Sequence, residues 1–359
     1  MNERQRVNHG YITGGISVGP IGVPVRRRYV VTTTSVLLAL AALAFIALVT
    51  GTLHYPISRI VTVLAGDGSR IENLVIVDRR LVRIAAAIAV GFMLGMSGAL
   101  TQSITRNPIA SPDILGVTTG ASAVAVFFVT NPGTAIGPSD ASATSILTPA
   151  TLIGGIATTS LILALAWRGG FDGLRLVLVG LGINAIAVAA ITWMMTRATT
   201  TDASIAARWL TGSVDGVKSG DLLLLGPIAA LGLIASVTLG RSVSTLQLGR
   251  DVATSLGTPA GRTELAALAV AVLLASAATA VAGPVAFVAF VAPQAALRLF
   301  RTAGPTPFAA GLVGAVMLAA SDLVAQHLLF PLPAGVVTSV VGAPCLLLLI
   351  VTQFRSSSV

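Results

Sequence analysis

Long stretches without a charged residue recur along this chain of 359 residues and constrain its fold more than any other feature. The segment from Ile84 to Thr105 holds 22 uncharged residues, enough for a helix to cross a hydrocarbon core about 30 Å thick. Such runs cover residues 31–58, 84–105, 114–139, 141–167, 176–196, 222–240, 265–297, 302–321 and 323–354. Gly283-Pro284 breaks the 33-residue run in two, which gives about ten spans. With 55% hydrophobic and 10% charged residues, an all-α polytopic membrane protein is predicted.

The basic residues predict the orientation in the membrane. With both termini inside, the inner segments carry 14 Arg and Lys residues and the outer segments carry 8. This places a cytoplasmic tail at residues 1–30, the membrane domain at 31–354 and a short cytoplasmic tail at 355–359. The net charge of +9 is spread thinly and forms no basic patch interleaved with aromatic residues, so nucleic-acid binding is not expected.

Three outer arginines, Arg79, Arg80 and Arg83, run against that charge bias. They have two interpretations, either snorkelling to lipid headgroups or a docking site for acidic groups of an external partner. Beyond them, Gly91, Gly95 and Gly98 share one helical face where another helix can approach closely.

The turn after the second span is polar. Asn107-Pro108 ends one helix, and Ser111, followed by Pro112 and Asp113, has the pattern of an N-cap that starts the next. The turn is either a gate at the cytoplasmic mouth or an ordinary connection. Asn184 in the fifth span is either an interhelical hydrogen-bonding residue or a pathway-lining amide.

Asp322 is the one carboxylate set within a predicted span, which makes it a candidate for function. The open alternatives are a proton relay and a buried structural hydrogen bond. Gly180 and Gly182 resemble the start of a dinucleotide fingerprint but lie mid-membrane without a preceding strand. The only lysine, Lys218, follows Val217 rather than glycine, so the chain has no ATP-binding P-loop, and the three histidines have no metal-ligand spacing. The sequence therefore predicts neither an enzyme nor a metal site.

A set of motifs is distributed over residues 30–354. The motifs are Arg80-Leu81-Val82-Arg83, Arg106-Asn107-Pro108-Ile109-Ala110, Ser111-Pro112-Asp113-Ile114-Leu115-Gly116, Trp209-Leu210-Thr211-Gly212-Ser213, Leu248-Gly249-Arg250, Ala282-Gly283-Pro284-Val285-Ala286-Phe287-Val288 and Leu332-Pro333-Ala334-Gly335. Together they resemble the FecCD permeases, the membrane subunits of ABC importers for ferric siderophores, haem and vitamin B12. The stretches around Trp167 and around Asp322 to Gln326 are most similar to one of the two permease subunits of ferric-enterobactin importers.

The resemblance implies a type II ABC importer permease in the cytoplasmic membrane. Its implied partners are a second, unlike permease subunit, two ATPase subunits that hold ATP and Mg, and an extracytoplasmic substrate-binding protein that delivers a ferric siderophore. The chain itself would need no cofactor. An ion-gradient-driven secondary transporter, or an importer of haem or cobalamin, is the alternative.

The resemblance also assigns expected roles to residues of this chain. Those for docking of the binding protein are Arg80, Arg83 and Trp209. Those for the gate and pathway are Asn107, Ile109, Asp172, Gly173, Leu174, Leu178 and Asn184. Those for contact with the ATPase lie in a coupling loop at about residues 241–262, namely Leu248, Gly249, Arg250, Ser255, Leu256, Gly257 and Arg262. Without the resemblance, that loop would be taken for a plain positive-inside connection.

Three departures from the family pattern matter. Val82 replaces the proline of the usual Arg-Leu-Pro-Arg. Gln326 stands where vitamin B12 permeases carry an arginine, which argues against cobalamin. Gly173-Leu174 replaces a hydroxyl pair, so this half of the gate is expected to close by apolar contact.

Overall fold

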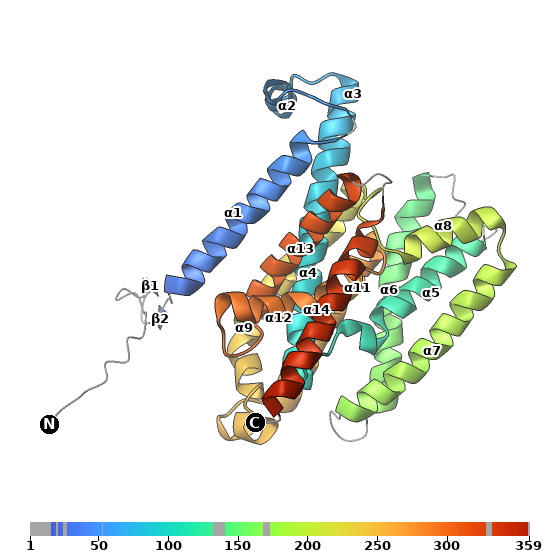
Figure 1. The fold of residues 1–359 in the computed structure, drawn as a ribbon. Helices are drawn as coiled ribbons and strands as arrows, with labels where there is room; N and C mark the ends of the chain where they lie inside the picture. The colour runs from blue at the N-terminus through green and yellow to red at the C-terminus, as the bar shows by residue number, and fades with distance from the viewer. Residues whose placement is uncertain are drawn as a thin grey trace.

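A computed structural model of the chain shows a bundle of helices (Figure 1) and describes residues 16–18, 21–23, 27–51, 53–131, 141–167, 173–327 and 332–357. Seven helical segments in these ranges are long and apolar enough to span a membrane: α1 (Arg27–Val49), α4 (Val82–Thr105) with the turns before it, α6 (Ala141–Ala166), α7 (Gly173–Arg197), α9 (Ser219–Leu246), α11 (Ala260–Ala282) and α13 (Pro307–His327). Three further helical stretches are apolar over a shorter length: α5 (Val117–Thr130), α12 (Val288–Phe300) and residues Ala334–Leu348 of α14 (Ala334–Ser357). These helices occupy the ten positions expected from the uncharged runs, so the all-α polytopic architecture is confirmed.

The break at Gly283-Pro284 is also confirmed. Helix α11 ends at Ala282, Gly283 has φ +71°, and α12 begins at Val288 after a non-helical connection. Helix α13 continues through Asp322 to His327, whereas the uncharged run from which this span was predicted ends at residue 321.

The second span begins much earlier than the uncharged run from Ile84. Helix α3 (Arg70–Asn73), the π-helix η1 (Leu74–Leu81) and α4 form one helical segment of 36 residues. Ser69 starts it with a capping box to Glu72. Val82 keeps the backbone N–H that a proline would lack, so nothing interrupts the helix there. Arg80 and Arg83 consequently lie inside a helix and not at its entrance.

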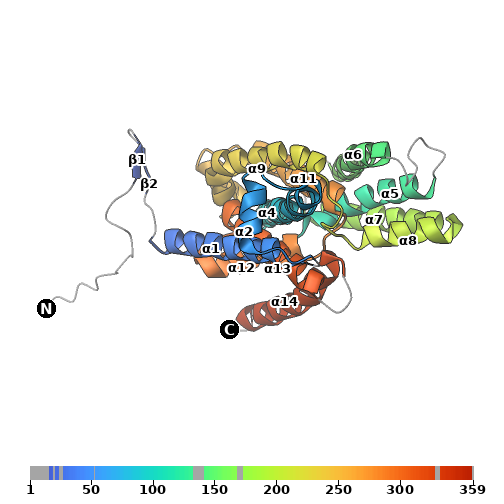
Figure 2. The ribbon, with the colours of Figure 1, turned by 90° about the horizontal axis from the view of Figure 1, so that it is seen from above.

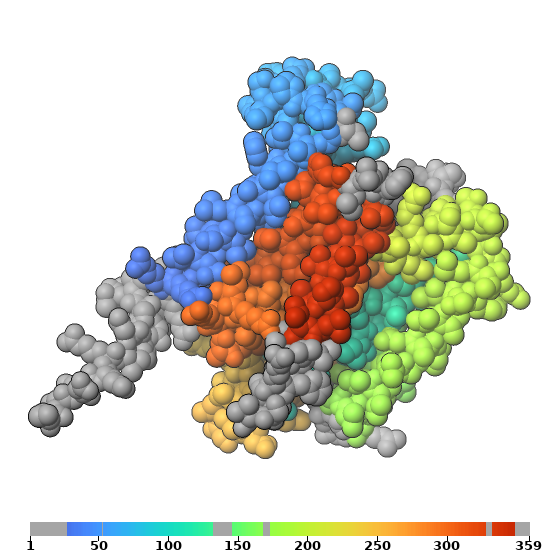
Figure 3. All heavy atoms as spheres, in the orientation of Figure 1, coloured from blue at the N-terminus to red at the C-terminus, as the bar shows by residue number. Residues whose placement is uncertain are grey.

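The first turns of this segment, α3 and η1, pack with the short helix α2 (Ile57–Leu64). We call these three elements the cap, which protrudes from the bundle at the top of Figures 1 and 3. Ile60 and Val63 of α2 are buried against Ile76 of η1. Arg59 and Glu72 close the cap with two hydrogen bonds of 2.7 Å each.

Helix α4 lies at the centre of the bundle, among α9, α11, α12 and α13 when viewed from above (Figure 2). A Cβ atom on Gly91 would overlap the carbonyl oxygen of Gly314 in α13, and one on Gly98 would overlap that of Ala289 in α12. The small-residue face predicted from the sequence is therefore the surface on which α4 packs, backbone against backbone.

The remaining elements are short or peripheral: a hairpin of β1 (Ile16–Val18) and β2 (Ile21–Val23) in the N-terminal tail, η2 (Pro112–Leu115), α8 (Thr200–Leu210) and α10 (Arg250–Ser255). The sequence did not predict the hairpin. The end of α14 and the α9–α11 connection that contains α10 lie on the side of the bundle opposite the cap, and α1 runs from its start toward the cap (Figure 1).

Candidate functional site

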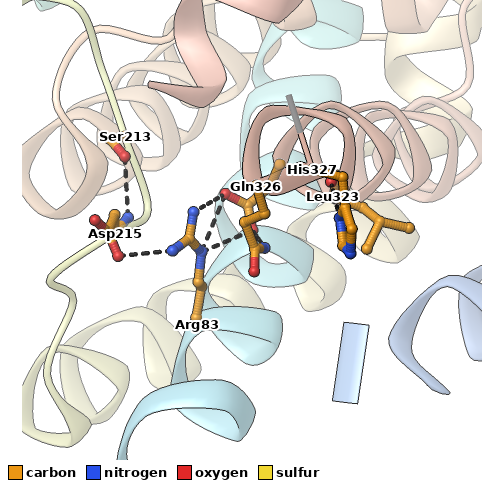
Figure 4. A network of polar contacts seen from close by, with 7 residues as sticks. Arg83, Ser213, Asp215, Leu323, Gln326 and His327 are labelled. Atoms are coloured by element: carbon orange, nitrogen blue, oxygen red, sulfur yellow. Dashed lines mark hydrogen bonds and ion pairs between the residues drawn. The ribbon is translucent and has the colours of Figure 1, made fainter. Parts of the chain in front are cut away.

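Arg83 is the centre of a polar cluster on the cap side of the bundle (Figure 4). Its Nε lies 2.9 Å from Oδ2 of Asp322, and its Nη2 lies 2.8 Å from Oδ1 of the same carboxylate. Gln326, one turn further along α13, donates from Nε2 to Oδ2 of Asp322 at 2.8 Å. The Asp322 side chain is 5% exposed. Asp322 is thus buried and paired with a base that another helix supplies, which is the arrangement that the hydrogen-bond alternative describes.

A second carboxylate completes the Arg83 cluster, which we define as Arg83, Asp215, Asp322 and Gln326. Asp215 lies in the connection between α8 and α9, and its Oδ1 is 2.6 Å from Nη1 of Arg83. Ser213 accepts a hydrogen bond of 3.0 Å from the backbone N–H of Asp215. The cluster therefore joins α4, α13 and the α8–α9 connection. Sequence reasoning missed Asp215, although glycines at 212 and 216 mark a turn around it.

Arg80, expected to dock a partner, contacts its own chain. It donates to the carbonyl oxygen of Leu48 at 2.7 Å and to that of Leu53, and its guanidinium lies 5.9 Å from the centre of the Tyr55 ring. These contacts satisfy carbonyl groups at and beyond the end of α1. Within the described ranges, neighbouring Arg79 is exposed and makes no ion pair.

Trp209, the third expected docking residue, lies near the end of α8 and is partly buried. Its carbonyl oxygen accepts a hydrogen bond from Gly212 at 3.1 Å and packs against Gly283 of the α11–α12 break. Trp209 therefore lies just before the α8–α9 connection, which contains Asp215.

The opposite side of the bundle carries the expected gate. Helix α4 ends at Thr105, Arg106 adopts φ +49°, and the Asn107 side chain accepts a hydrogen bond of 3.0 Å from the backbone N–H of Ile109. Both Asn107 and Ile109 are exposed. Ser111 is an N-cap as predicted, but the helix it starts is the single turn η2, and α5 begins only after Gly116.

Asn184 of α7 joins three elements near this turn. Its amide oxygen accepts a hydrogen bond from the Thr119 hydroxyl of α5, and its amide nitrogen donates 3.2 Å to the carbonyl oxygen of Asp113 in η2. The interhelical alternative thus describes the contacts of Asn184.

Asp113 itself has a perturbed carboxyl group. Desolvation raises its pKa above the usual range, and this effect outweighs the hydrogen bond from the Ser111 hydroxyl, which lowers the pKa.

The other half of the expected gate lies at the start of α7. Leu174 and Leu178 are 71% and 60% exposed, and a side chain on Gly173 would meet no atom within 4 Å. Asp172 falls outside the described residues. The exposed side chains at this helix start are apolar, as expected from Gly173-Leu174.

The connection between α9 and α11 is shorter than the loop expected for coupling. Helix α9 extends to Leu246 and α11 begins at Ala260, so Arg241 and Arg262 belong to helices and the connection is residues 247–259. We call this connection the α10 knob. It holds one short helix, α10. Ala253 is buried against Leu246 and Ala260, which fixes the knob to the helices beside it.

The outer face of the α10 knob is apolar. Leu248, Val252 and Leu256 are 63%, 47% and 62% exposed, and they follow one another at intervals of four residues. Gly249 and Gly257, at the two ends of α10, have φ of +112° and +81°, conformations that favour glycine. Ser255 and Arg250 are also exposed, and Arg250 lies 4.0 Å from Glu264 of α11.

Known proteins match this chain over most of its length. It is 38% identical to the ferric enterobactin transport system permease protein FepG of Escherichia coli (strain K12), over 92% of this chain and 98% of that protein. It is 33% identical to the iron(3+)-hydroxamate import system permease protein FhuG of Bacillus subtilis (strain 168), over 86% of this chain and 92% of that protein.

The fold also matches a solved one. An inward-facing structure described as a metal-chelate type ABC transporter superposes with a TM-score of 0.73 at 24% identity, over 90% of this chain and 99% of that one. The model of the FecCD transport family matches residues 38–352. The chain therefore belongs to the FecCD transport family.

Proposed function

We propose that this chain is a permease subunit of a binding-protein-dependent ABC importer that carries a ferric siderophore across the cytoplasmic membrane. The observation that carries the proposal is the match to a ferric enterobactin permease along nearly the whole of both chains. Relatives named for achromobactin and iron(3+)-hydroxamate transport support the wider class of ferric chelates.

Hydrolysis of ATP belongs to a partner in this proposal, because the sequence has no P-loop. The α10 knob supports it, since exposed leucine and valine side chains outside the spans are suited to fill a groove on another protein. Two ATPase subunits would bind this knob and its counterpart on a second permease chain. The end of helix α14 lies on the α10 side, which we assign to the cytoplasm from the distribution of basic residues.

The cap side then faces the extracytoplasmic binding protein. Arg80 lies in the cap and Arg83 follows it on the same helical segment, whereas Trp209 lies near the end of α8. We assign Arg83 to a carboxylate of that protein, because its Nη1 points to the exposed Asp215 side of the cluster. Asn107, Ile109 and the start of α7 form the proposed cytoplasmic gate.

Uptake by the reconstituted importer tests the proposal. The permease, its companion permease and the ATPase are placed in proteoliposomes with the binding protein, and uptake of radiolabelled ferric enterobactin is measured with and without ATP. Uptake that requires both ATP and the binding protein is expected. Uptake without the ATPase that stops when an uncoupler is added would instead identify a secondary transporter. Parallel assays with haem and cobalamin test the substrate class.

A further inference from the structure

The guanidinium of Arg83 is shared between an inner and an outer carboxylate. Arginine has five N–H donors. Asp322 takes the inner edge, formed by Nε and one N–H of Nη2, and Asp215 takes one N–H of Nη1. The edge of the guanidinium that faces away from α13 is thus hydrogen-bonded to Asp215 in the isolated chain.

The two carboxylates differ in how firmly they are held. The Asp322 side chain is 5% exposed and receives a further hydrogen bond from Gln326. The Asp215 side chain is 74% exposed, and its carboxylate contacts no group but Arg83 among the described residues. An ion pair exposed to this degree is weak, because water screens the two charges and holding both side chains in one geometry costs conformational entropy. Asp322 is therefore the fixed partner of Arg83, and Asp215 is the exchangeable one.

The charge balance decides what an acidic partner would meet. One guanidinium and two carboxylates give the cluster a net negative charge, so an approaching carboxylate is repelled as long as Asp215 stays in place. Once Asp215 turns away, Arg83 and Asp322 form a neutral pair with free N–H groups on the outer edge. A partner carboxylate can then replace the bond that Asp215 gave up.

The backbone around Asp215 is held by hydrogen bonds and burial, whereas its exposed side chain is held by the ion pair with Arg83. Ser213 donates 2.7 Å to the carbonyl oxygen of Ala282, Gly335 donates 3.0 Å to that of Gly212, and Val214 is fully buried. These contacts anchor the connection to the end of α11 and the start of α14. Rotation of the Asp215 side chain alone is enough to free Arg83, with no opening of the α8–α9 connection.

We propose that Asp215 is an internal competitor for the docking arginine, which occupies the outer edge of Arg83 in the undocked permease and is displaced by a carboxylate of the binding protein. The inference rests on the proposed function of Arg83 as a docking residue. Asp215 then lowers the affinity of the permease for its binding protein and favours release after delivery.

The test measures binding of the purified binding protein to the complete importer in lipid nanodiscs, by its association and dissociation rates. Asp215→Asn should bind about two- to fivefold more tightly, the range that an exposed ion pair can account for. Asp78→Asn is the matched control, because Asp78 is an exposed carboxylate on the cap that makes no ion pair among the described residues. It removes the same charge without touching Arg83.

Arg83→Gln separates the inference from the docking proposal. If Arg83→Gln weakens binding but Asp215→Asn binds no better than Asp78→Asn, docking stands and the competitor is overturned. If Arg83→Gln binds as tightly as the parent, the docking role of Arg83 itself is wrong. Because Arg83→Gln leaves the buried Asp322 without its counter-charge, the double variant Arg83→Gln/Asp322→Asn is measured beside it. Melting temperatures of all the variants are compared with that of the parent, so that binding is compared on folded importer.

Discussion

Arg83 and Asp322 lie 239 positions apart in the sequence and form a two-pronged ion pair that joins α4 to α13. Removing one member of such a pair leaves the other charge poorly solvated in the protein, which costs more than the pair itself contributes. The pair therefore makes the cap side of the bundle sensitive to either residue.

Asp322→Asn should destabilise the permease by on the order of 3 kcal/mol, because Arg83 is left without its buried counter-charge. Gln326→Ala removes only one hydrogen bond to the same carboxylate and should cost about 1 kcal/mol. Thermal unfolding in detergent measures both. The double variant with Arg83→Gln should recover part of the loss, and an Asp322→Asn protein as stable as the parent would contradict the assignment.

Gly98→Ala should prevent normal packing of α4, because its Cβ would overlap the carbonyl oxygen of Ala289 and neither backbone can move aside. Gly240→Ala in α9 is the control, since a Cβ there meets no atom within 4 Å. The control should leave stability unchanged or raise it by up to about 1 kcal/mol. Yield of monodisperse protein and melting temperature compare the two, and equal behaviour would show that α4 is not tightly packed at Gly98.

Leu256→Asp should detach the ATPase, since it places a charge in the apolar face of the α10 knob. Thr254→Asp puts the same charge about half a turn away on α10 and should be tolerated. Co-purification of the ATPase and coupled uptake are the measurements. Replacing Gly257 by Trp should also uncouple transport, but its φ of +81° adds backbone strain to the added bulk, so the leucine variant is the cleaner one. Normal transport by Leu256→Asp would show that the α10 knob only connects two helices and does not bind the ATPase.

Asn107→Cys, paired with a cysteine at the matching site of the companion permease, should crosslink in one nucleotide state of the importer and not in another. The reason is that Asn107 is exposed at the turn that ends α4, where the two subunits would meet at the cytoplasmic mouth. Crosslinking yields with ATP, with ADP and without nucleotide are compared. The same yield in all three would place the gate elsewhere.

Asp113→Asn should leave the melting temperature unchanged or raise it. Desolvation raises the pKa of this carboxyl, so its charged form is disfavoured in the folded protein and stability falls as the pH rises through that pKa. The neutral amide has no such penalty. Melting temperatures of the parent and the variant, measured from pH 5 to pH 8, should approach one another toward the acid end, and a variant less stable at every pH would contradict this.

The spans could be predicted from the sequence because apolar length and turn residues are local signals. Asp322 could be selected for the same reason, as a carboxylate in an uncharged setting. Its partner could not, because Arg83 becomes its neighbour only through the packing of α4 on α13. Arg80 was expected to face outward, and nothing local in the sequence indicates that the carbonyl groups of Leu48 and Leu53 lie within its reach. The limits of the α10 knob were missed because α9 continues through a stretch that reads as a polar loop.

The helical segment from Arg70 to Thr105 begins in the cap and ends beside the α10 knob, where Nη1 of Arg106 lies 3.9 Å from a Cβ built on Gly249. At 1.5 Å per residue this is a rod of about 54 Å. The close backbone contacts of this rod, at Gly91, Gly95 and Gly98, all lie in its second half, so the cap is carried on the longer free part. In the proposed importer, the binding protein and the ATPase would therefore contact opposite ends of one continuous helical segment.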